Sequence, residues 1–267
     1  MSFSAAWLAL REPYDLRARN TAVIDAVMAT LAGRASVTIA DLACGTGSTF
    51  RALRPRVKAH QNWRLADNDL SLLARAPQSS PPDTHVTTMP IDLNRDLEAV
   101  LDGPVDLVTT SALLDLVSDE WLQRLAVETA ARRLPIYAAL SYDGRIEMTP
   151  ADVADKKIIA AVNKHQRTDK GFGLALGPGA AQQAIERFER VGYSVAQGPS
   201  DWVFAPTDRE IQVEILSGWA AAAREMGDMP LPDVVSWLAR RRDLVTAGRS
   251  SIRVGHVDFF ARPTGTR

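Results

Sequence analysis

The segment that most constrains the fold is VTIADLACGTGSTF, at residues 37–50. It opens with a mainly apolar run, 37–42, that predicts a buried strand. The turn that follows contains Gly45 and Gly47, and a ligand can lie against the backbone there because no Cβ blocks its approach. A helix is expected next, and its first N–H groups have no partner within the helix. A strand, a glycine-rich turn and a helix in this order form the unit at which open α/β sheets bind nucleoside cofactors.

Strand and helix patterns alternate around this unit. Strands that alternate with helices indicate a parallel sheet with right-handed crossovers, so the expected fold class is α/β. The sequence predicts strands at residues 37–42, 63–66, 86–91, 105–110 and 136–141, with helices at 49–53, 70–76, 95–101 and 119–133.

The chain on either side of this repeat is expected to be mostly helical. Residues 5–31 show helical spacing of apolar side chains, with a break near Pro13. Thr207 and Glu210 form a capping-box pattern at the start of a later helix. The later part of the chain predicts helices at 180–191, 207–226 and 231–246, and extended segments at 193–195, 202–204 and 252–261.

Two nucleoside cofactors use turns of this kind. A dinucleotide-binding turn needs a third glycine close to the pyrophosphate, and Phe50 stands at that position. Asp41, just before the turn, would repel a pyrophosphate but suits a ligand that carries an amino group. S-adenosylmethionine (SAM) carries both an ammonium and a sulfonium. The residues therefore favour SAM and disfavour an NAD(P)-dependent oxidoreductase.

Residues 41–47, DLACGTG, resemble motif I of the class I SAM-dependent methyltransferases, D-x-[AG]-x-G-x-G. The resemblance extends over residues 35–142. It implies a Rossmann-like sheet of seven strands, mostly parallel, whose last strand is antiparallel, and a final hairpin that pairs residues near 193–204 with 252–261. It also implies methyl transfer from SAM, with S-adenosylhomocysteine (SAH) as the product.

The resemblance further implies which residues bind the cofactor. Asp67, at the end of the second expected strand, matches the acid that holds the ribose hydroxyls, since a carboxylate accepts two hydrogen bonds. Arg19 either pairs with the SAM carboxylate or belongs to a helix that packs on the edge of the sheet. The expected cofactor-binding set is Asp41, Ala43, Gly45, Gly47, Asp67, Asn68, Asp92, Leu93, Ser111, Ala112, Leu113 and Arg19.

The expected organisation is a single methyltransferase domain. We interpret residues 1–34 as an N-terminal helical cap and 35–145 as the SAM-binding core. Residues 146–206 form a segment on the substrate side, 207–248 a helical insertion that contributes to a lid, and 249–267 the final strand.

Several acceptor classes are disfavoured. Enzymes that methylate amino groups of nucleic-acid bases, or of glutamine, carry an N/D-P-P-Y pattern where residues 111–115 read SALLD. Methylation of cytosine C5 needs a cysteine nucleophile near that strand, and the only cysteine, Cys44, lies in motif I. No His/Cys cluster has zinc spacing, and nothing supports a Mg²⁺ site built from Asp115 and Asp143. What remains is direct in-line transfer to an O, N, S or C nucleophile, and we expect a small-molecule acceptor.

No catalytic residue is assigned from the sequence. In-line displacement depends mainly on alignment and desolvation, and a general base is needed only where the nucleophile carries a proton. Tyr142, His165 and Asp169 are the candidates for such a base. Tyr142 could equally close the core, and His165 could face solvent. His256 is more simply a structural histidine.

Arginine clusters at 51–56 and 240–242 leave an RNA or protein methyltransferase open as an alternative. The net charge of -1 offers no general attraction for nucleic acid. A SAM-binding protein without catalytic activity is the other alternative. One cysteine excludes an intrachain disulfide and, without a secretory signal pattern or an apolar run of about 20 residues, favours a cytoplasmic protein that does not enter a membrane. The oligomeric state stays open.

Overall fold

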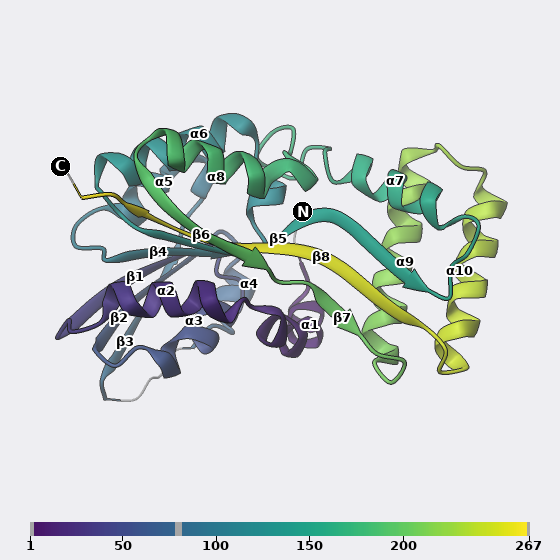
Figure 1. Ribbon diagram of the computed structural model, residues 1–267, viewed down its shortest axis with the longest axis horizontal. Helices are drawn as coiled ribbons and strands as arrows, with labels where there is room; N and C mark the ends of the chain where they lie inside the picture. Colours follow the sequence, from purple (N-terminus) through teal and green to yellow (C-terminus); the bar gives the residue numbers. More distant parts are fainter. Residues whose placement is uncertain (1–2, 78–81, 266–267) are drawn as a thin grey trace.

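Five strands pair in parallel at the centre of the protein, in a computed structural model that describes residues 3–77 and 82–265. The sheet order is β3-β2-β1-β4-β5-β8-β6, and β7 pairs with β8 beyond the end of β6 (Figure 1). The strands are β1 Ser36–Leu42, β2 His60–Asp67, β3 Thr84–Pro90, β4 Leu107–Ser111, β5 Ile136–Thr149, β6 Tyr193–Pro199, β7 Trp202–Phe204 and β8 Ser251–Pro263.

The predicted fold class is confirmed. β8, the last strand along the chain, runs antiparallel to both β5 and β6. The expected final hairpin is also confirmed, because β6 and β7 both pair with β8. The strand β7 is additional to the seven strands that the resemblance implies.

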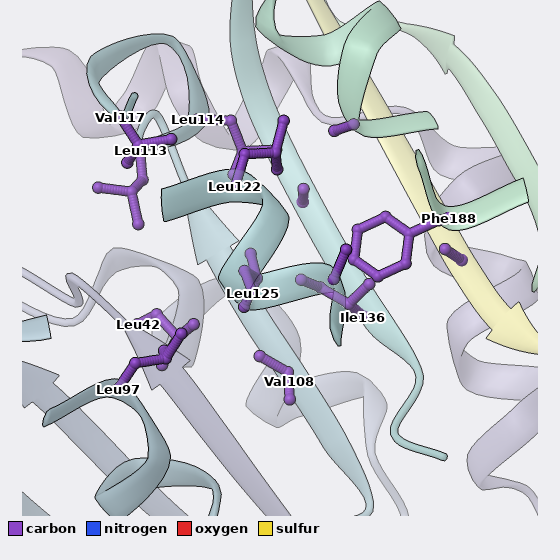
Figure 2. Close-up of a cluster of buried hydrophobic side chains, with 14 of the residues drawn as sticks. Leu42, Leu97, Val108, Leu113, Leu114, Val117, Leu122, Leu125, Ile136 and Phe188 are labelled. Atoms are coloured by element: carbon purple, nitrogen blue, oxygen red, sulfur yellow. The ribbon is translucent and has the colours of Figure 1, made fainter. Parts of the chain in front are cut away.

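Helices cover both faces of the sheet, as Figure 1 shows. One face carries α5 (Leu93–Leu101), α6 (Asp119–Ala131) and α8 (Ala180–Arg190), and the other carries α2 (Thr21–Leu31) and α3 (Ser48–Leu53). A short α4 (Leu70–Leu73) follows β2. Figure 2 shows part of the first core, including Leu42, Val108 and Ile136 from the strands, Leu122 and Leu125 from α6, and Phe188 from α8.

A second core forms where β5 and β8 continue past the parallel strands. β5 was expected to end at residue 141, but it extends to Thr149, and β8 follows it in antiparallel register. Three helices pack on this extension: α7 (Asp155–His165), α9 (Arg209–Met226) and α10 (Leu231–Thr246). Trp237 from α10 and Phe204 from β7 are fully buried there. The helical insertion therefore packs into a core that it shares with β5, β7, β8 and α7.

The predicted break near Pro13 is wrong. Helix α1 runs over Ala5–Ala18 with Pro13 inside it, and the chain turns at Arg19 instead. The side chain of Asn20 accepts a hydrogen bond from the Val23 N–H at 3.1 Å and so begins α2. Pro13 removes one hydrogen bond within α1, but Leu10 and Tyr14 on either side of it pack against the second core.

The predicted capping box at Thr207 and Glu210 is also wrong. Helix α9 begins at Arg209 with Asp208 as its N-cap residue, and no side chain caps the first turn. The Asp208 carboxylate instead accepts hydrogen bonds from the Ala205 N–H at 2.8 Å and from the Tyr14 hydroxyl at 3.1 Å. The loop before α9 is thereby fixed to helix α1.

Among residues 3–77 and 82–265, no helix combines the length and the apolar character that crossing a membrane requires.

The second core contains a buried ion pair. A substitution in this pair tests how much the pair contributes to the stability of the protein. Asp155 accepts hydrogen bonds from the fully buried guanidinium of Arg241 and from the Trp237 Nε1–H at 2.9 Å. We expect Asp155→Ala to lower the free energy of unfolding by about 3–5 kcal/mol, because it leaves a buried cation without a partner.

Urea denaturation of the full chain measures this change. Glu186→Ala is the control: it removes an i,i+4 pair with Arg190 in which both side chains are exposed, and we expect a loss below about 1 kcal/mol. Equal losses in the two variants would contradict the assignment of Asp155 to the second core.

Candidate functional site

A cavity of about 320 Å³ lies at the carboxyl ends of the parallel strands. Parallel strands place their carboxyl ends along one edge of a sheet, which is where ligands bind in open α/β folds. Helix α1 and the segment around Phe172 also line this cavity. Of the residues expected to bind a cofactor, its wall contains Ala43, Gly45, Asp67, Asn68, Asp92, Leu93, Ser111, Ala112 and Leu113.

The glycine-rich turn after β1 forms one wall. Ala43 and Gly45 have positive φ values of 53° and 54°, a conformation that glycine adopts without strain. The Gly45 N–H donates to Asp67 Oδ2 at 2.8 Å. A Cβ built on Gly45 would lie 3.2 Å from Cδ1 of Leu8, so the side chain of α1 already fills the space above this residue.

Asp67 at the end of β2 faces this turn. Its Oδ1 accepts a hydrogen bond from the Asp69 N–H at 2.9 Å, and its Oδ2 accepts the one from Gly45. An ionised carboxylate has about four acceptor sites, so both oxygens keep acceptor capacity for hydroxyl groups of a ligand. The hydrogen bonds fix the orientation of the carboxylate before any ligand arrives.

The far end of the cavity is more apolar. Ile91 and Leu93 line it beside Asp92, which is the N-cap residue of α5 and accepts from the Asn94 N–H at 2.9 Å. Phe172 completes this end and stacks edge-on against Trp121, with ring centroids 5.4 Å apart. A flat, mainly apolar group with polar edges fits such a surface.

Three residues of the expected set lie behind the wall and do not line the cavity. Asp41 is fully buried, and its Oδ1 accepts from the Thr109 hydroxyl at 2.8 Å, while its Oδ2 has no partner. Burial raises the pKa of Asp41 to about 7, and the Thr109 hydrogen bond and the charge of Arg19 only partly offset this. Gly47 has φ 85° and serves as the N-cap residue of α3.

Arg19 is the third of these residues. Its guanidinium donates to the hydroxyl oxygens of Tyr137, Thr49 and Ser111 at 3.3, 3.3 and 3.4 Å. These contacts tie α1 to β5, α3 and β4 beneath the cavity. A packing role for the N-terminal helix therefore describes Arg19 better than a contact with a cofactor does.

Arg11 is a cavity residue that the sequence reasoning missed. It lines the wall together with Leu8 and Asp15, and its Nε lies 3.1 Å from Asp15 Oδ2. Asp15 also accepts from the Trp202 Nε1–H at 2.9 Å, and its burial raises its pKa. The signal was present in the sequence, because residues 8, 11 and 15 fall on one face of a helix.

A second cavity of about 450 Å³ opens beside the first. Phe3, Arg11, Ala112 and Leu116 line both cavities, so the two meet at the carboxyl end of β4. Its walls come from α1, β5, α7, α9 and β8, and therefore join both cores. The aromatic members of its wall are Phe3, Trp7, Tyr142, His165, Trp202, Trp219 and His256.

Two of the three candidate bases line the second cavity. Tyr142 donates its hydroxyl hydrogen to Asn163 Oδ1 at 2.7 Å, and burial raises its pKa. His165 has Nε2 2.9 Å from Glu225 and Nδ1 3.3 Å from Lys170 Nζ. Asp169 lies outside both cavities, because its carboxylate turns back to accept from the Gly171 and Gly173 N–H groups at 2.7 and 3.1 Å.

Asp115 and His256 also line the second cavity. Burial raises the pKa of Asp115 to about 6, and burial lowers the pKa of His256 to about 4. The sequence reasoning considered Asp115 only as a metal ligand, although its place four residues after the end of β4 was a sufficient signal. In the described part of the chain, no group of three or more His, Cys, Asp or Glu side chains is arranged to hold a metal ion.

Comparisons with known proteins give similar folds only. No family model and no curated protein matches the sequence. Similar solved structures include the cyclopropane synthase MmaA2 from Mycobacterium tuberculosis, at 12% identity and TM-score 0.49, covering 90% of this chain and 83% of that one. The YcgJ protein from Bacillus subtilis matches at 12% identity and TM-score 0.48, over 92% of this chain and 100% of that one.

A SAM-dependent methyltransferase from Thiobacillus denitrificans, solved in complex with SAH, matches at 14% identity and TM-score 0.45, over 98% of this chain and 100% of that one. Similarity at this level carries no argument about activity. The fold assignment rests on the strand order of this chain and its antiparallel last strand, which are those that the motif at residues 41–47 implies. The protein has the Rossmann-like fold of the class I SAM-dependent methyltransferases.

The buried carboxyl of Asp41 predicts a pH-dependent stability. Its pKa is raised from 3.8 to about 7, so the folded state holds this proton more tightly than the unfolded state. The contribution of this proton to the free energy of unfolding has its full value below about pH 4, and it is lost as the pH rises through about 7.

Asp41→Asn keeps the shape of the side chain and removes the titration. The wild-type stability, measured relative to this variant by urea denaturation, should fall by up to about 1.4 kcal/mol per pH unit across that window. Parallel stability curves between pH 4 and 8 would show that Asp41 does not titrate as its burial implies.

Proposed function

We propose that this chain binds SAM in the first cavity and transfers its methyl group to a small molecule in the second. The observation that carries the proposal is the junction of the two cavities. Arg11, Ala112 and Leu116 line both, so a ligand in one cavity can touch a ligand in the other. A direct transfer needs this contact, because the acceptor must reach the methyl carbon in line.

The first cavity has the chemistry that SAM requires. Asp67 offers pre-oriented carboxylate oxygens to the ribose hydroxyls. Ile91 and Leu93 provide an apolar surface for the adenine, next to the polar groups of Asn68 and Asp92. We assign the amino-acid carboxylate to Arg11 rather than Arg19, because Arg11 is the guanidinium that lines this wall.

When bound, SAM supplies a methyl group activated by its sulfonium. The chain contributes position and a dry environment. Ala112 and Leu116 line the place where the two cavities meet with small or apolar side chains, and Leu140 and Val254 continue the apolar wall on the acceptor side. Such a surface aligns an acceptor and keeps water from competing with it.

Two features argue against the alternatives, which are an RNA or protein methyltransferase and a SAM-binding protein without catalytic activity. Arg51, Arg56, Arg240 and Arg241, from the two arginine clusters, form ion pairs with Glu12, Asp25, Asp152 and Asp155. A surface for RNA would keep such charges available for phosphates. A protein without catalytic activity would have no need of an open space beside the cofactor, whereas the second cavity provides about 450 Å³.

The single-domain organisation and the cytoplasmic location stay predictions. The cytoplasmic location is supported by the one cysteine, Cys44, which is free and buried.

A titration of the full chain with SAH tests the cofactor site. Wild-type protein should bind SAH saturably in isothermal titration calorimetry, with NAD⁺ as a ligand that should not bind. Asp67→Ala should weaken SAH binding by about 10- to 100-fold, because it removes charge-assisted hydrogen bonds to the ribose.

Asp25→Ala is the matched control, since Asp25 lies on α2, is 60% exposed and pairs only with Arg56 among the described contacts. Circular dichroism verifies that each variant is folded. Absence of SAH binding to folded wild-type protein would refute the proposed function.

A further inference from the structure

One buried carboxylate in the wall of the second cavity has an unpartnered oxygen. Asp115 lies in a short turn, Leu114–Leu116, between the residues Ala112 and Leu116 that line both cavities. Its side chain lines the second cavity, only 5% of the residue is exposed, and its Oδ1 has no hydrogen-bond partner. Burying an unsatisfied carboxylate oxygen costs free energy, so such an atom indicates a site for a hydrogen-bond donor.

Three other buried or half-buried ionisable groups of this cavity, His165, Tyr142 and His256, already have partners. Both ring nitrogens of His165 are engaged, by Glu225 and Lys170, and the Tyr142 hydroxyl donates to Asn163. His256 has its Nδ1 3.0 Å from the Val254 carbonyl oxygen, and burial keeps its ring neutral by lowering its pKa to about 4. Asp115 is the buried group of this wall that keeps an open acceptor atom.

Burial raises the pKa of Asp115, and charges on neighbouring elements partly offset this increase. Arg11 on α1 and Lys170 after α7 both favour its ionised form, as does the backbone of Tyr142 in β5. Each cation also has a partner of its own, Asp15 for Arg11 and His165 for Lys170. Burial is the larger effect and raises the pKa of Asp115 to about 6, so the carboxylate is ionised at neutral pH and is a stronger base than an exposed aspartate.

The remaining walls suit a cation with an apolar body. Trp7, Trp202 and Trp219 line the cavity, and aromatic faces attract an ammonium group. Glu214 and Glu225 are further members of the same wall and add negative charge on the side toward α9. A cationic acceptor would gain more from these carboxylates than a neutral one, and an anionic acceptor would be repelled by them.

We infer that the second cavity binds an amine acceptor with an apolar or aromatic body, and that Asp115 binds its ammonium group and removes its proton. This inference rests on the proposed function and specifies the class of its acceptor. Asp115 is then a catalytic residue, since it touches the reacting nitrogen.

The step balances without any further reactant. The Asp115 carboxylate takes one proton from R–NH₃⁺, which frees the nitrogen lone pair. The amine nitrogen forms a bond to the methyl carbon as the carbon–sulfur bond breaks, and the electron pair of that bond stays on sulfur. The products are R–NH₂⁺–CH₃, SAH and protonated Asp115, which returns its proton to water.

Binding of paired probes tests this inference without relying on turnover. The full chain is saturated with SAH and titrated at pH 7.5 with 2-phenylethylamine and tryptamine, and with their alcohol counterparts 2-phenylethanol and tryptophol. We expect each amine to bind at least about tenfold more tightly than its alcohol, because only the amine forms a charged contact with Asp115.

Asp115→Asn should bring amine and alcohol to within about twofold of each other by removing that charge. Glu120→Gln, an exposed change on α6 outside both cavities, should keep the preference. In wild-type protein the preference should disappear as the pH falls through about 6, where Asp115 becomes protonated while the amines stay charged.

The outcomes separate the two proposals. If SAH binds but no amine binds better than its alcohol, or if Asp115→Asn keeps the preference, the inference is overturned and the cofactor site stands. If none of the four probes binds the SAH-saturated protein, the inference is likewise overturned. If folded protein does not bind SAH, the proposed function fails and the inference fails with it.

Discussion

The parallel pairing of β1 with β2 on one side and β4 on the other is the constraint on which the rest of the structure depends. Its register sets Leu42 beside Ala66 and Thr110, so the three strands end at the same edge. The glycine turn, Asp67 and Ser111 follow directly from those ends. Backbone hydrogen bonds alone therefore bring together residues that lie far apart in the chain.

The same edge explains why α1 matters to the site. The helix lies across the glycine turn, with Leu8 above Gly45, and Arg19 at its end holds β4, β5 and α3 from below. Asp15 connects the helix to Trp202 in the second core. A single helix thus packs against the second core, lines both cavities, and places Arg11 where the cavities meet.

Two of the buried carboxyls near the cavities, Asp41 and Asp115, differ in whether they line a cavity. Asp41 has a hydroxyl partner, lies behind the wall and has a pKa of about 7, so it is part of the support beneath the cavity. Asp115 is in the wall of the second cavity, its Oδ1 has no hydrogen-bond partner, and its pKa is about 6. Burial raises both pKa values, but of the two only Asp115 lines a cavity.

The sequence by itself determined the sheet and its ligand-binding edge, because these depend on local patterns. Apolar runs, turn glycines and acids at strand ends are short-range signals, and they suffice to assign Gly45, Asp67 and Asp92 to the cavity. Only the tertiary structure decided which polar groups face a cavity. Asp41 and Arg19 lie behind its wall and Asp169 outside it, while Arg11 and Asp115 face inward. The second core and its cavity arise because the extended β5 and β8 pair over a long range and α9 and α10 close on them, and no local pattern records such contacts.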